Sequence, residues 1–259
     1  MTKKHDIMWV KSVDSTNEEC RRRISDIDNL SVVAAMSQSS GRGQRGNVWL
    51  SEPGQNLTFS VVLKLPVNVM AGELEPMHAY DQFILSEIAA LSVVDLLADR
   101  GIKAKIKWPN DIYVGDRKIC GILIENSLRG EWIQHSIIGI GLNVNQRNFD
   151  VTLPNPTSMV LSTPKSEASF DIHDLLDEFM SVFKDYIDRY CHIRGGYGRL
   201  RQLYHAQLWR KDIHSRFIVP DTGEFTGMIK GVTDKGCLLV ENPEGIVREF
   251  SFKEISYVI

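Results

Sequence analysis

An alternation of apolar and basic residues from Ile102 to Trp108 constrains the fold more than any other stretch of this 259-residue chain. Ile102, Ala104, Ile106 and Trp108 alternate with three lysines. Because successive side chains of a strand point to opposite faces, the pattern predicts a half-buried strand. Pro109-Asn110-Asp111 predicts a turn directly after it, and residues 118–125 predict the returning strand. A sheet is therefore expected at the centre of the chain.

The remaining patterns predict an α+β protein. Apolar runs indicate buried strands at residues 32–36, 57–65 and 137–144, and helical spacing indicates helices at 80–100 and 171–190. After Tyr204 the chain turns to short strands separated by turns at 221–223, 234–236 and 242–245, which indicates a small β-barrel. We therefore expect two domains, residues 1–204 and 205–259.

Composition and charge exclude several classes of function. A net charge of −3 and an isoelectric point near 6.2 argue against a protein that coats nucleic acid. The most apolar stretch, residues 83–97, is interrupted by polar and charged side chains, so no membrane role is expected. The four cysteines form no Cys-x-x-Cys pair, which favours a reduced, cytoplasmic chain. There is also no His-x-x-x-His metal spacing and no Gly-x-Ser-x-Gly nucleophile motif.

Glycines beside cations suggest a site for an anion. Arg42 and Arg45 lie in the loop Gly41-Arg42-Gly43-Gln44-Arg45-Gly46, and two lysines, Lys107 and Lys118, belong to the predicted hairpin. Glycines let the backbone approach a ligand closely. The buried strand at 137–144 carries two more, Gly139 and Gly141. The sequence therefore predicts a cationic pocket near these segments.

Neutral polar residues add hydrogen-bonding groups to the predicted cationic site. Ser15, Thr16, Asn17 and Gln38 can hold an uncharged polar ligand by hydrogen bonds. Ser15 and Glu18 also match the capping box Ser-x-x-Glu, which predicts a helix that begins here. Ordinary helix capping therefore competes with ligand contact as the role of the first three residues, and the two can coexist.

Lys118 is the first choice for the central cation. Regular alternation would place it on one face with Cys120, Ile122 and Ile124, so that its ammonium lies at the margin of an apolar surface. An anionic ligand would supply the missing partner. The alternative is a lysine at a strand end whose ammonium reaches water.

Taken in order and spacing, the loop at 41–46, Lys107-Trp108-Pro109-Asn110-Asp111, Lys118-Ile119-Cys120-Gly121 and the glycine strand resemble the biotin protein ligases. The resemblance covers nearly the whole chain and implies a short form that lacks an N-terminal DNA-binding domain. It implies a mixed β-sheet flanked by helices, of the class II synthetase-like type, with a C-terminal SH3-like β-barrel. The activity implied is formation of biotinyl-5′-AMP from biotin and Mg²⁺·ATP, followed by biotin transfer to a lysine of a biotin carboxyl carrier domain.

The resemblance also implies roles for individual residues. The catalytic residues expected are Lys118, Arg45 and Lys107. The biotin-binding residues expected are Ser15, Thr16, Asn17, Gln38, Arg42, Gly43, Gln44, Lys118 and Gly121. The ATP- and adenylate-binding residues expected are Arg42, Arg45, Trp49, Lys107, Asn110, Lys118 and Asn143, with Asn110 and Asp111 near Mg²⁺. Many regulatory bacterial members carry an arginine where this chain has Gln44, so one positive charge of the loop is absent.

Three alternatives remain open at this point. A lipoate or octanoate protein ligase shares the lysine-bearing strand, although the loop at 41–46 and Lys-Trp-Pro-Asn-Asp favour biotin. A DNA-binding biotin sensor would need a helix-turn-helix before residue 15, so no operator binding is expected. A non-catalytic partner protein would leave the cation cluster unexplained. A homodimer is compatible with the sequence.

Overall fold

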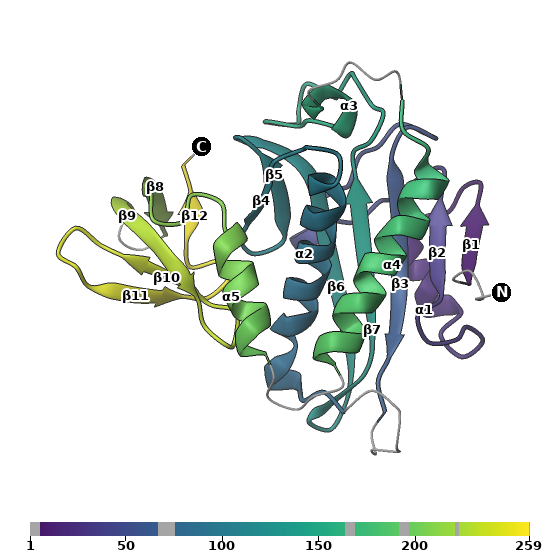
Figure 1. Cartoon of the computed structure of the whole chain (residues 1–259), viewed down its shortest axis with the longest axis horizontal. Coiled ribbons are helices and arrows are strands. Elements are labelled where there is room, and N and C mark those ends of the chain that lie inside the picture. The colour runs from purple at the N-terminus through teal and green to yellow at the C-terminus, as the bar shows by residue number, and fades with distance from the viewer. Residues whose placement is uncertain (1–5, 67–75, 164–168, 192–196, 221–222, 259) are drawn as a thin grey trace.

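A mixed seven-stranded sheet forms the larger part of the computed structural model, which describes residues 6–66, 76–163, 169–191, 197–220 and 223–258 (Figure 1). The strands run in the order β1-β2-β3-β7-β6-β5-β4, and only the pair β1–β2 is parallel. Their bounds are β1 Ile7–Val10, β2 Val32–Ala35, β3 Leu57–Lys64, β4 Ala104–Lys107, β5 Asp111–Val114, β6 Arg117–Arg129 and β7 Trp132–Leu142. The strands predicted from the sequence are all present.

Side chains of β3 alternate between two different environments. Phe59 belongs to the main core and packs against Phe179 of the helix α4 (Ile172–Tyr190), with ring centroids 5.0 Å apart. Its neighbours Thr58 and Ser60 point to the opposite face, where Ser60 meets the helix α1 (Thr16–Arg22). One face of the sheet is thus sealed by packing, while the other is covered only in part.

Two long helices, α2 (Phe83–Ala98) and α4, cover the sealed face, and α1 lies on the other (Figure 1). The expected helix at 80–100 is α2, preceded by the 3₁₀ turn η2 (Ala79–Asp81) and ended by Gly101 at φ +71°. Nearly all residues of α2 are buried because the sheet, α4 and the helix α5 (Gly198–Gln207) surround it. α3 (Met159–Ser162) is a single turn.

A five-stranded antiparallel sheet follows α5, in the order β11-β10-β9-β8-β12. Its strands are β8 His214–Val219, β9 Gly223–Val232, β10 Leu238–Glu241, β11 Val247–Phe250 and β12 Ser256–Tyr257. The predicted turns at 234–236 and 242–245 connect β9 to β10 and β10 to β11, whereas residues 221–222 lie outside the described part of the chain. The expected boundary at residue 204 falls inside α5, and the division into domains stays a prediction.

One buried ion pair links the helices α2 and α5. Arg201 of α5 donates to the carboxylate of Glu87 of α2, which is fully buried, and to the carbonyl of Thr233 at 2.6 Å, in the turn between β9 and β10. The second oxygen of Glu87, Oε2, has no partner among the described residues. Burial raises the pKa of Glu87, and the nearby Arg201 opposes that rise. Arg201 is therefore needed to neutralise the carboxylate of Glu87, which burial has removed from water.

We expect Arg201→Met to lower the free energy of unfolding by roughly 3–5 kcal/mol, because it leaves Glu87 buried and uncompensated. Without Arg201 the pKa of Glu87 in the folded state would rise further above its unfolded value. The variant therefore loses more stability as the pH rises from the unfolded pKa to the folded pKa. Urea unfolding at several pH values measures this loss of unfolding free energy. The double variant Glu87→Leu with Arg201→Met should recover most of the stability. Equal stability of Arg201→Met and the unmodified chain would contradict this account.

The predicted capping box at the start of α1 does not form. Ser15 is the N-cap residue, with φ −152° and ψ 137°, yet its side chain makes no capping hydrogen bond. Glu18 pairs instead with Arg21 and with Arg42 of the glycine loop. Two guanidinium groups attract this carboxylate more strongly than one backbone N–H does. The prediction of the helix start was correct, and the prediction of the capping box was wrong.

Candidate functional site

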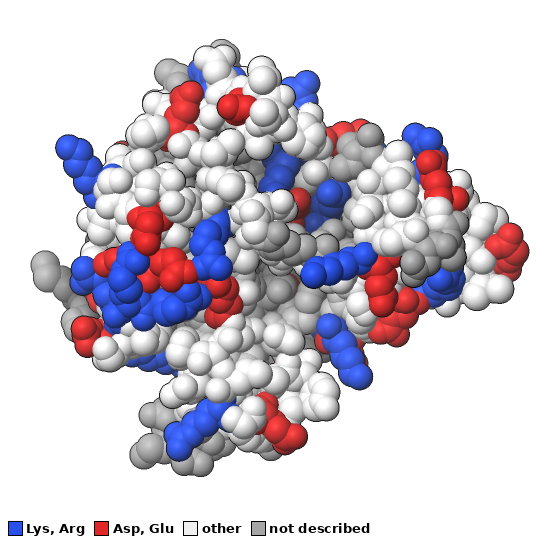
Figure 2. All heavy atoms as spheres, turned by 180° about the vertical axis from the view of Figure 1, so that it is seen from behind, with Lys and Arg blue, Asp and Glu red and all other residues white. Residues whose placement is uncertain are grey.

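A pocket of about 400 Å³ opens on the face of the sheet that α2 and α4 do not cover. Viewed from that side, the molecule is hollowed between its larger part and the C-terminal sheet, with Lys and Arg side chains around the hollow (Figure 2). The pocket gathers segments that are far apart in the sequence: α1, the glycine loop, the β4–β5 turn, β6, β7 and the C-terminal strand region. The predicted site residues that line it are Ser15, Thr16, Asn17, Gln38, Arg42, Gly43, Gln44, Trp49, Lys107, Asn110, Asp111, Lys118 and Gly121.

Neutral hydrogen-bonding groups form one end of this pocket. Ser60 Oγ lies 2.7 Å from Thr16 Oγ1 and 2.6 Å from Asn17 Oδ1, and the Thr16 backbone N–H donates to Gln38 Oε1 at 2.7 Å. Asn17 Nδ2 donates to Glu125 Oε2 at 2.8 Å. Because Asn17 is buried and held at both ends of its amide, its orientation is fixed before any ligand binds.

Two glycines of β7 make room for side chains of the chain itself. A Cβ atom at Gly139 would lie 2.3 Å from Asn17 Oδ1, and one at Gly141 would lie 2.3 Å from Cε2 of Trp49. Both distances are far below van der Waals contact. The sequence correctly indicates a close approach at these glycines, and the structure identifies the approaching groups as Asn17 and Trp49.

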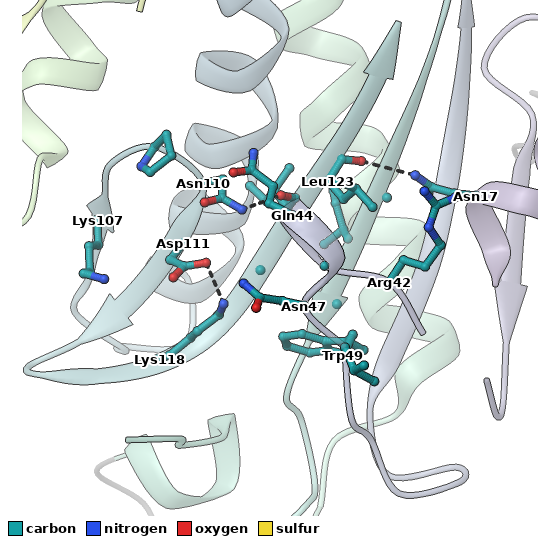
Figure 3. Close-up of a pocket in the computed structure, with 18 of the residues that line it drawn as sticks. Asn17, Arg42, Gln44, Asn47, Trp49, Lys107, Asn110, Asp111, Lys118 and Leu123 are labelled. Atoms are coloured by element: carbon teal, nitrogen blue, oxygen red, sulfur yellow. Dashed lines mark hydrogen bonds and ion pairs between the residues drawn. The ribbon is translucent and has the colours of Figure 1, made fainter. Parts of the chain in front are cut away.

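The glycine loop folds as a small hairpin over the pocket. Trp49 N donates to Gly41 O at 2.9 Å, Gly43 N donates to Asn47 O at 2.7 Å, and a 3₁₀ turn, η1 (Gln44–Gly46), forms the tip. Arg42, which lies on the Asn17 side of the pocket (Figure 3), forms ion pairs with Glu18 and Glu125. The side chain of Arg45 lies outside the described part of the structure, so its predicted role stays a prediction.

Three pocket-lining residues each have a polar atom that is buried without a hydrogen-bond partner among the described residues. The atoms are Gln44 Oε1, Trp49 Nε1 and Tyr257 Oη. Unpaired buried polar atoms cost free energy unless a ligand or water satisfies them. The family resemblance assigned Gln44 and Trp49 to the site, whereas Tyr257 is a lining residue that the sequence did not indicate.

The strand that carries Lys118 departs from regular alternation. The register of β5 and β6 shifts so that Ile112 pairs with Cys120 while Tyr113 pairs with Lys118, which makes Ile119 the extra residue of a β-bulge. A Cβ at Gly121 would lie 3.3 Å from Lys118 Nζ, so Lys118 and Gly121 share the pocket face. The prediction that Lys118 shares a face with Cys120, Ile122 and Ile124 was wrong, because a bulge reverses the parity after it.

Lys118 is paired with a carboxylate of the same hairpin. Its Nζ lies 2.6 Å from Asp111 Oδ1 and 5.8 Å from the centre of the Trp49 ring (Figure 3). Asn110 Nδ2 donates to Ile122 O at 2.8 Å, and Asn110 Oδ1 has no hydrogen-bond partner among the described residues. The pocket wall thus offers an ammonium from β6, a carboxylate from the start of β5 and an amide oxygen from the residue before β5.

Lys107 is held differently, between two aromatic rings. Its Nζ lies 4.9 Å from the ring centre of Tyr113 and 5.1 Å from that of Tyr257, and no ion pair is recorded for it among the described residues. Burial lowers the pKa of Lys107, Asp111 opposes this shift, and Lys118 and Arg210 reinforce it. A buried cation without a carboxylate partner favours an anionic ligand.

We expect a phosphate-bearing ligand to bind more weakly as the pH rises. This weakening should begin at a lower pH than it would if Lys107 had the pKa of an ordinary lysine. The protonated form of Lys107 binds the anion, and its lowered pKa brings deprotonation closer to neutrality. The dissociation constant of ATP, used as a phosphate-bearing probe and measured from about pH 7 to about pH 10, should therefore rise. Lys107→Arg keeps the charge over this range and should flatten the profile. Parallel profiles for both proteins would exclude titration of Lys107 as the cause.

The structure also brings to the pocket residues that the sequence did not predict, and it leaves one predicted residue outside the pocket lining. Asn143, expected at the nucleotide, does not line the pocket; it is buried, and its Nδ2 donates to Thr157 O at 2.9 Å, which fixes the loop beside the start of β6. The lining residues that the sequence missed include Phe252, Lys253, Ile255, Ser256 and Tyr257. They come from the C-terminal sheet, and nothing in their local sequence indicates a ligand.

A metal ion would need ligands beyond those of the protein. No group of three or more His, Cys, Asp or Glu side chains suited to a metal occurs in the described part of the chain. Asp111 and the free amide oxygen of Asn110 fit a Mg²⁺ ion that keeps several waters and takes phosphate oxygens from a nucleotide. The donor set is therefore compatible with a nucleotide-bound Mg²⁺.

Comparison with known proteins gives a consistent result. The model of the biotin/lipoate A/B protein ligase family matches residues 9–143. The chain is 31% identical to the bifunctional ligase/repressor BirA of Bacillus spizizenii over 85% of its length and 64% of that protein. It is 28% identical to the biotin–[acetyl-CoA-carboxylase] ligase of Paracoccus denitrificans, covering 90% of this chain and 92% of that one. A structure of biotin protein ligase from Aquifex aeolicus in complex with biotin and ATP superposes with a TM-score of 0.76, at 25% identity and 97% coverage of both chains.

The family match covers more than half of the chain, so this protein belongs to the biotin/lipoate A/B protein ligase family. The mixed sheet flanked by helices agrees with the superposed structure, and the C-terminal antiparallel sheet fits the expected SH3-like domain. Among the described residues, no helix combines the length and apolar character needed to cross a bilayer.

Proposed function

We propose that the protein is an ATP-dependent biotin protein ligase. It activates biotin as biotinyl-5′-AMP and then transfers the biotinyl group to a lysine of a biotin carboxyl carrier domain. Biotin is favoured over lipoate as the substrate because the relatives reported above are ligases named for biotin or BirA, and the superposed structure is a complex with biotin and ATP.

One observation carries the proposal. A single pocket combines a neutral hydrogen-bonding end, built around Thr16 and Asn17, with a cationic end that holds Lys107 and Lys118. Biotin has an uncharged ureido ring at one end and a carboxylate at the other, and ATP brings phosphates. A pocket of this polarity accommodates both, with the carboxylate beside the α-phosphate.

In the first step the biotin carboxylate attacks the α-phosphorus of ATP, an O–P bond forms, and pyrophosphate leaves. Both reacting groups are anions, so their repulsion has to be offset before they come within about 3.5 Å. Lys118 lies at the boundary of the two ends of the pocket, where it can contact the carboxylate and the α-phosphate together. Lys107 provides the second positive charge, on the phosphate side.

Asp111 and Asn110 are the residues that would hold a Mg²⁺ ion brought by the nucleotide. The ion would supply charge neutralisation at the phosphates and orient them for attack. If Asp111 turns toward the ion, Lys118 exchanges a carboxylate partner for the substrate anions. The ion pair at 2.6 Å thus positions Lys118 before substrates bind, and Lys118 can exchange Asp111 for an anionic substrate.

In the second step the acceptor lysine amine attacks the acyl carbonyl of the adenylate, an amide bond forms, and AMP leaves. The loop hairpin with Arg42, Gly43 and Gln44 covers the adenylate and keeps out the water that would hydrolyse it. We assign the protein to the cytoplasm, in keeping with four cysteines that are all unpaired. Absence of operator binding and the possible homodimer remain predictions.

The proposal is tested by incubating a biotin carrier domain with the protein, biotin and Mg²⁺·ATP, and measuring its intact mass. One biotinyl increment on one lysine is expected, and lipoate in place of biotin should give none. A carrier in which that lysine is replaced by arginine is the control. A lipoyl increment on a lipoyl domain, with no reaction toward biotin, would support the lipoate alternative instead.

A further inference from the structure

The C-terminal sheet contributes an aromatic side chain to the cationic end of the pocket. Tyr257 lies on β12 and pairs with Phe217 of β8. Its ring packs against Trp209, with centroids 5.5 Å apart, and Trp209 packs in turn against Tyr113 of β5 at 5.3 Å. These three rings connect the C-terminal sheet to the β4–β5 hairpin.

Hydrogen bonds of Trp209 fix this aromatic cluster to the hairpin. Its backbone N–H donates to Ile106 O at 2.8 Å, and its indole N–H donates to Gly115 O at 2.8 Å. Ile106 directly precedes Lys107 in β4. Trp209 is therefore hydrogen-bonded to the hairpin on one side and packs against Tyr257 on the other. These contacts set the position of Tyr257 relative to Lys107.

The ammonium of Lys107 lies between the two tyrosine rings, at 4.9 Å from Tyr113 and 5.1 Å from Tyr257. The nearest charged partner across the β4–β5 ladder is Asp111, which is occupied by Lys118. The faces of aromatic rings attract a cation without neutralising its charge. Lys107 is thus stabilised in a buried position while its ability to bind an anion is preserved.

We propose that Tyr257 is a positioning residue for nucleotide binding: together with Tyr113 it holds the ammonium of Lys107 ready for the phosphates of ATP. The inference rests on the proposed function and extends it to a residue of the C-terminal sheet. A carboxylate in place of the ring would compete with the nucleotide for the same ammonium. Tyr257 acts through Lys107 and makes no contact with the reacting atoms.

The ring of Tyr257, rather than its hydroxyl, carries this role. Tyr257 Oη is buried and has no hydrogen-bond partner among the described residues. Removing an unpaired buried hydroxyl does not cost stability. Tyr257→Phe keeps the aromatic face and should recover nearly all of the ATP affinity, whereas Tyr257→Leu keeps only the apolar volume.

The test compares ATP and biotin separately. Tyr257→Leu should raise the KM for ATP by about 5- to 30-fold, with the KM for biotin changed by less than about twofold. Phe225→Leu is the matched control, because Phe225 packs within the same sheet against Phe217 and Phe250 and does not line the pocket. It should leave the KM for ATP unchanged. Far-UV circular dichroism and thermal unfolding verify that each variant is folded.

Three results would overturn the inference. Equal effects of Tyr257→Leu and Phe225→Leu would mean that the ring supports only the fold. Parallel rises of both KM values in Tyr257→Leu would mean that the whole pocket is disturbed. A loss in Tyr257→Phe as large as that in Tyr257→Leu would assign the effect to the hydroxyl.

Calorimetric titration with ATP in the absence of biotin separates this inference from the proposed function. If the unmodified protein binds ATP but makes no biotinyl-AMP, the proposed function fails while the comparison of Tyr257 variants still decides the role of the ring. The expected order of affinity is the unmodified protein equal to Tyr257→Phe, with Tyr257→Leu clearly weaker. The same affinity in all three would refute the inference.

Discussion

Lys118→Ala is expected to lower biotin-dependent exchange of pyrophosphate into ATP by at least about 10²- to 10³-fold, while the fold survives. In the proposed mechanism Lys118 is the cation that contacts both reactants, and its side chain is only partly buried. Without it, two anionic reactants meet beside the unpaired carboxylate of Asp111. The loss should therefore appear in kcat as well as in both KM values.

Lys103→Ala provides the matched control for Lys118, since Lys103 is an exposed lysine just before β4 that forms no ion pair with any residue the structure describes. It should retain full exchange activity. Circular dichroism of both variants establishes that they are folded. Near-normal exchange by folded Lys118→Ala would refute the role assigned to Lys118 and leave Lys107 as the principal cation.

The second large effect is expected from a single methyl group on β7. Gly139→Ala places its Cβ against Asn17 Oδ1 at 2.3 Å, and Asn17 cannot shift without breaking its bonds to Ser60 and Glu125. We expect the KM for biotin to rise by about 10- to 100-fold, because the fixed amide at the neutral end is lost. The KM for ATP should change much less, since Lys107 lies at the other end of the pocket.

Steady-state exchange assays with biotin and ATP varied in turn measure this separation. Gly198→Ala is the control, because no atom lies within 4 Å of the Cβ it would introduce. An unchanged KM for biotin in Gly139→Ala would show that Asn17 can move freely, and would remove it from the set of biotin-binding residues.

Short-range patterns, together with the resemblance to biotin protein ligases, explain why so much of the site was predictable. The strand and helix periods depend on residues a few positions apart. The cations and glycines of each site segment are also close together in the sequence. All predicted site residues with described side chains line the pocket, with the exception of Asn143. Asn143 directly follows β7, and its side chain donates to the carbonyl of Thr157.

The two errors have different causes. The capping box failed because Arg42, from another loop, pairs with the carboxylate of Glu18. The face of Lys118 was misassigned because β5 and β6 pair with a bulge at Ile119, inside a hairpin that the sequence did predict. Regular alternation does not indicate where a bulge falls, and the capping motif does not indicate which side chain from another loop reaches Glu18.

By itself the sequence determined the two sheets, the helices that cover the larger one, and the group of cations and neutral polar residues at the site. Tertiary structure alone decided which side chains meet. It placed Asn17 under Gly139, paired Lys118 with Asp111, and brought Tyr257 from the end of the chain onto Lys107. The physical reason is that periodicity and turn chemistry act over a few residues, whereas ion pairs and ring contacts depend on which strands finally become neighbours.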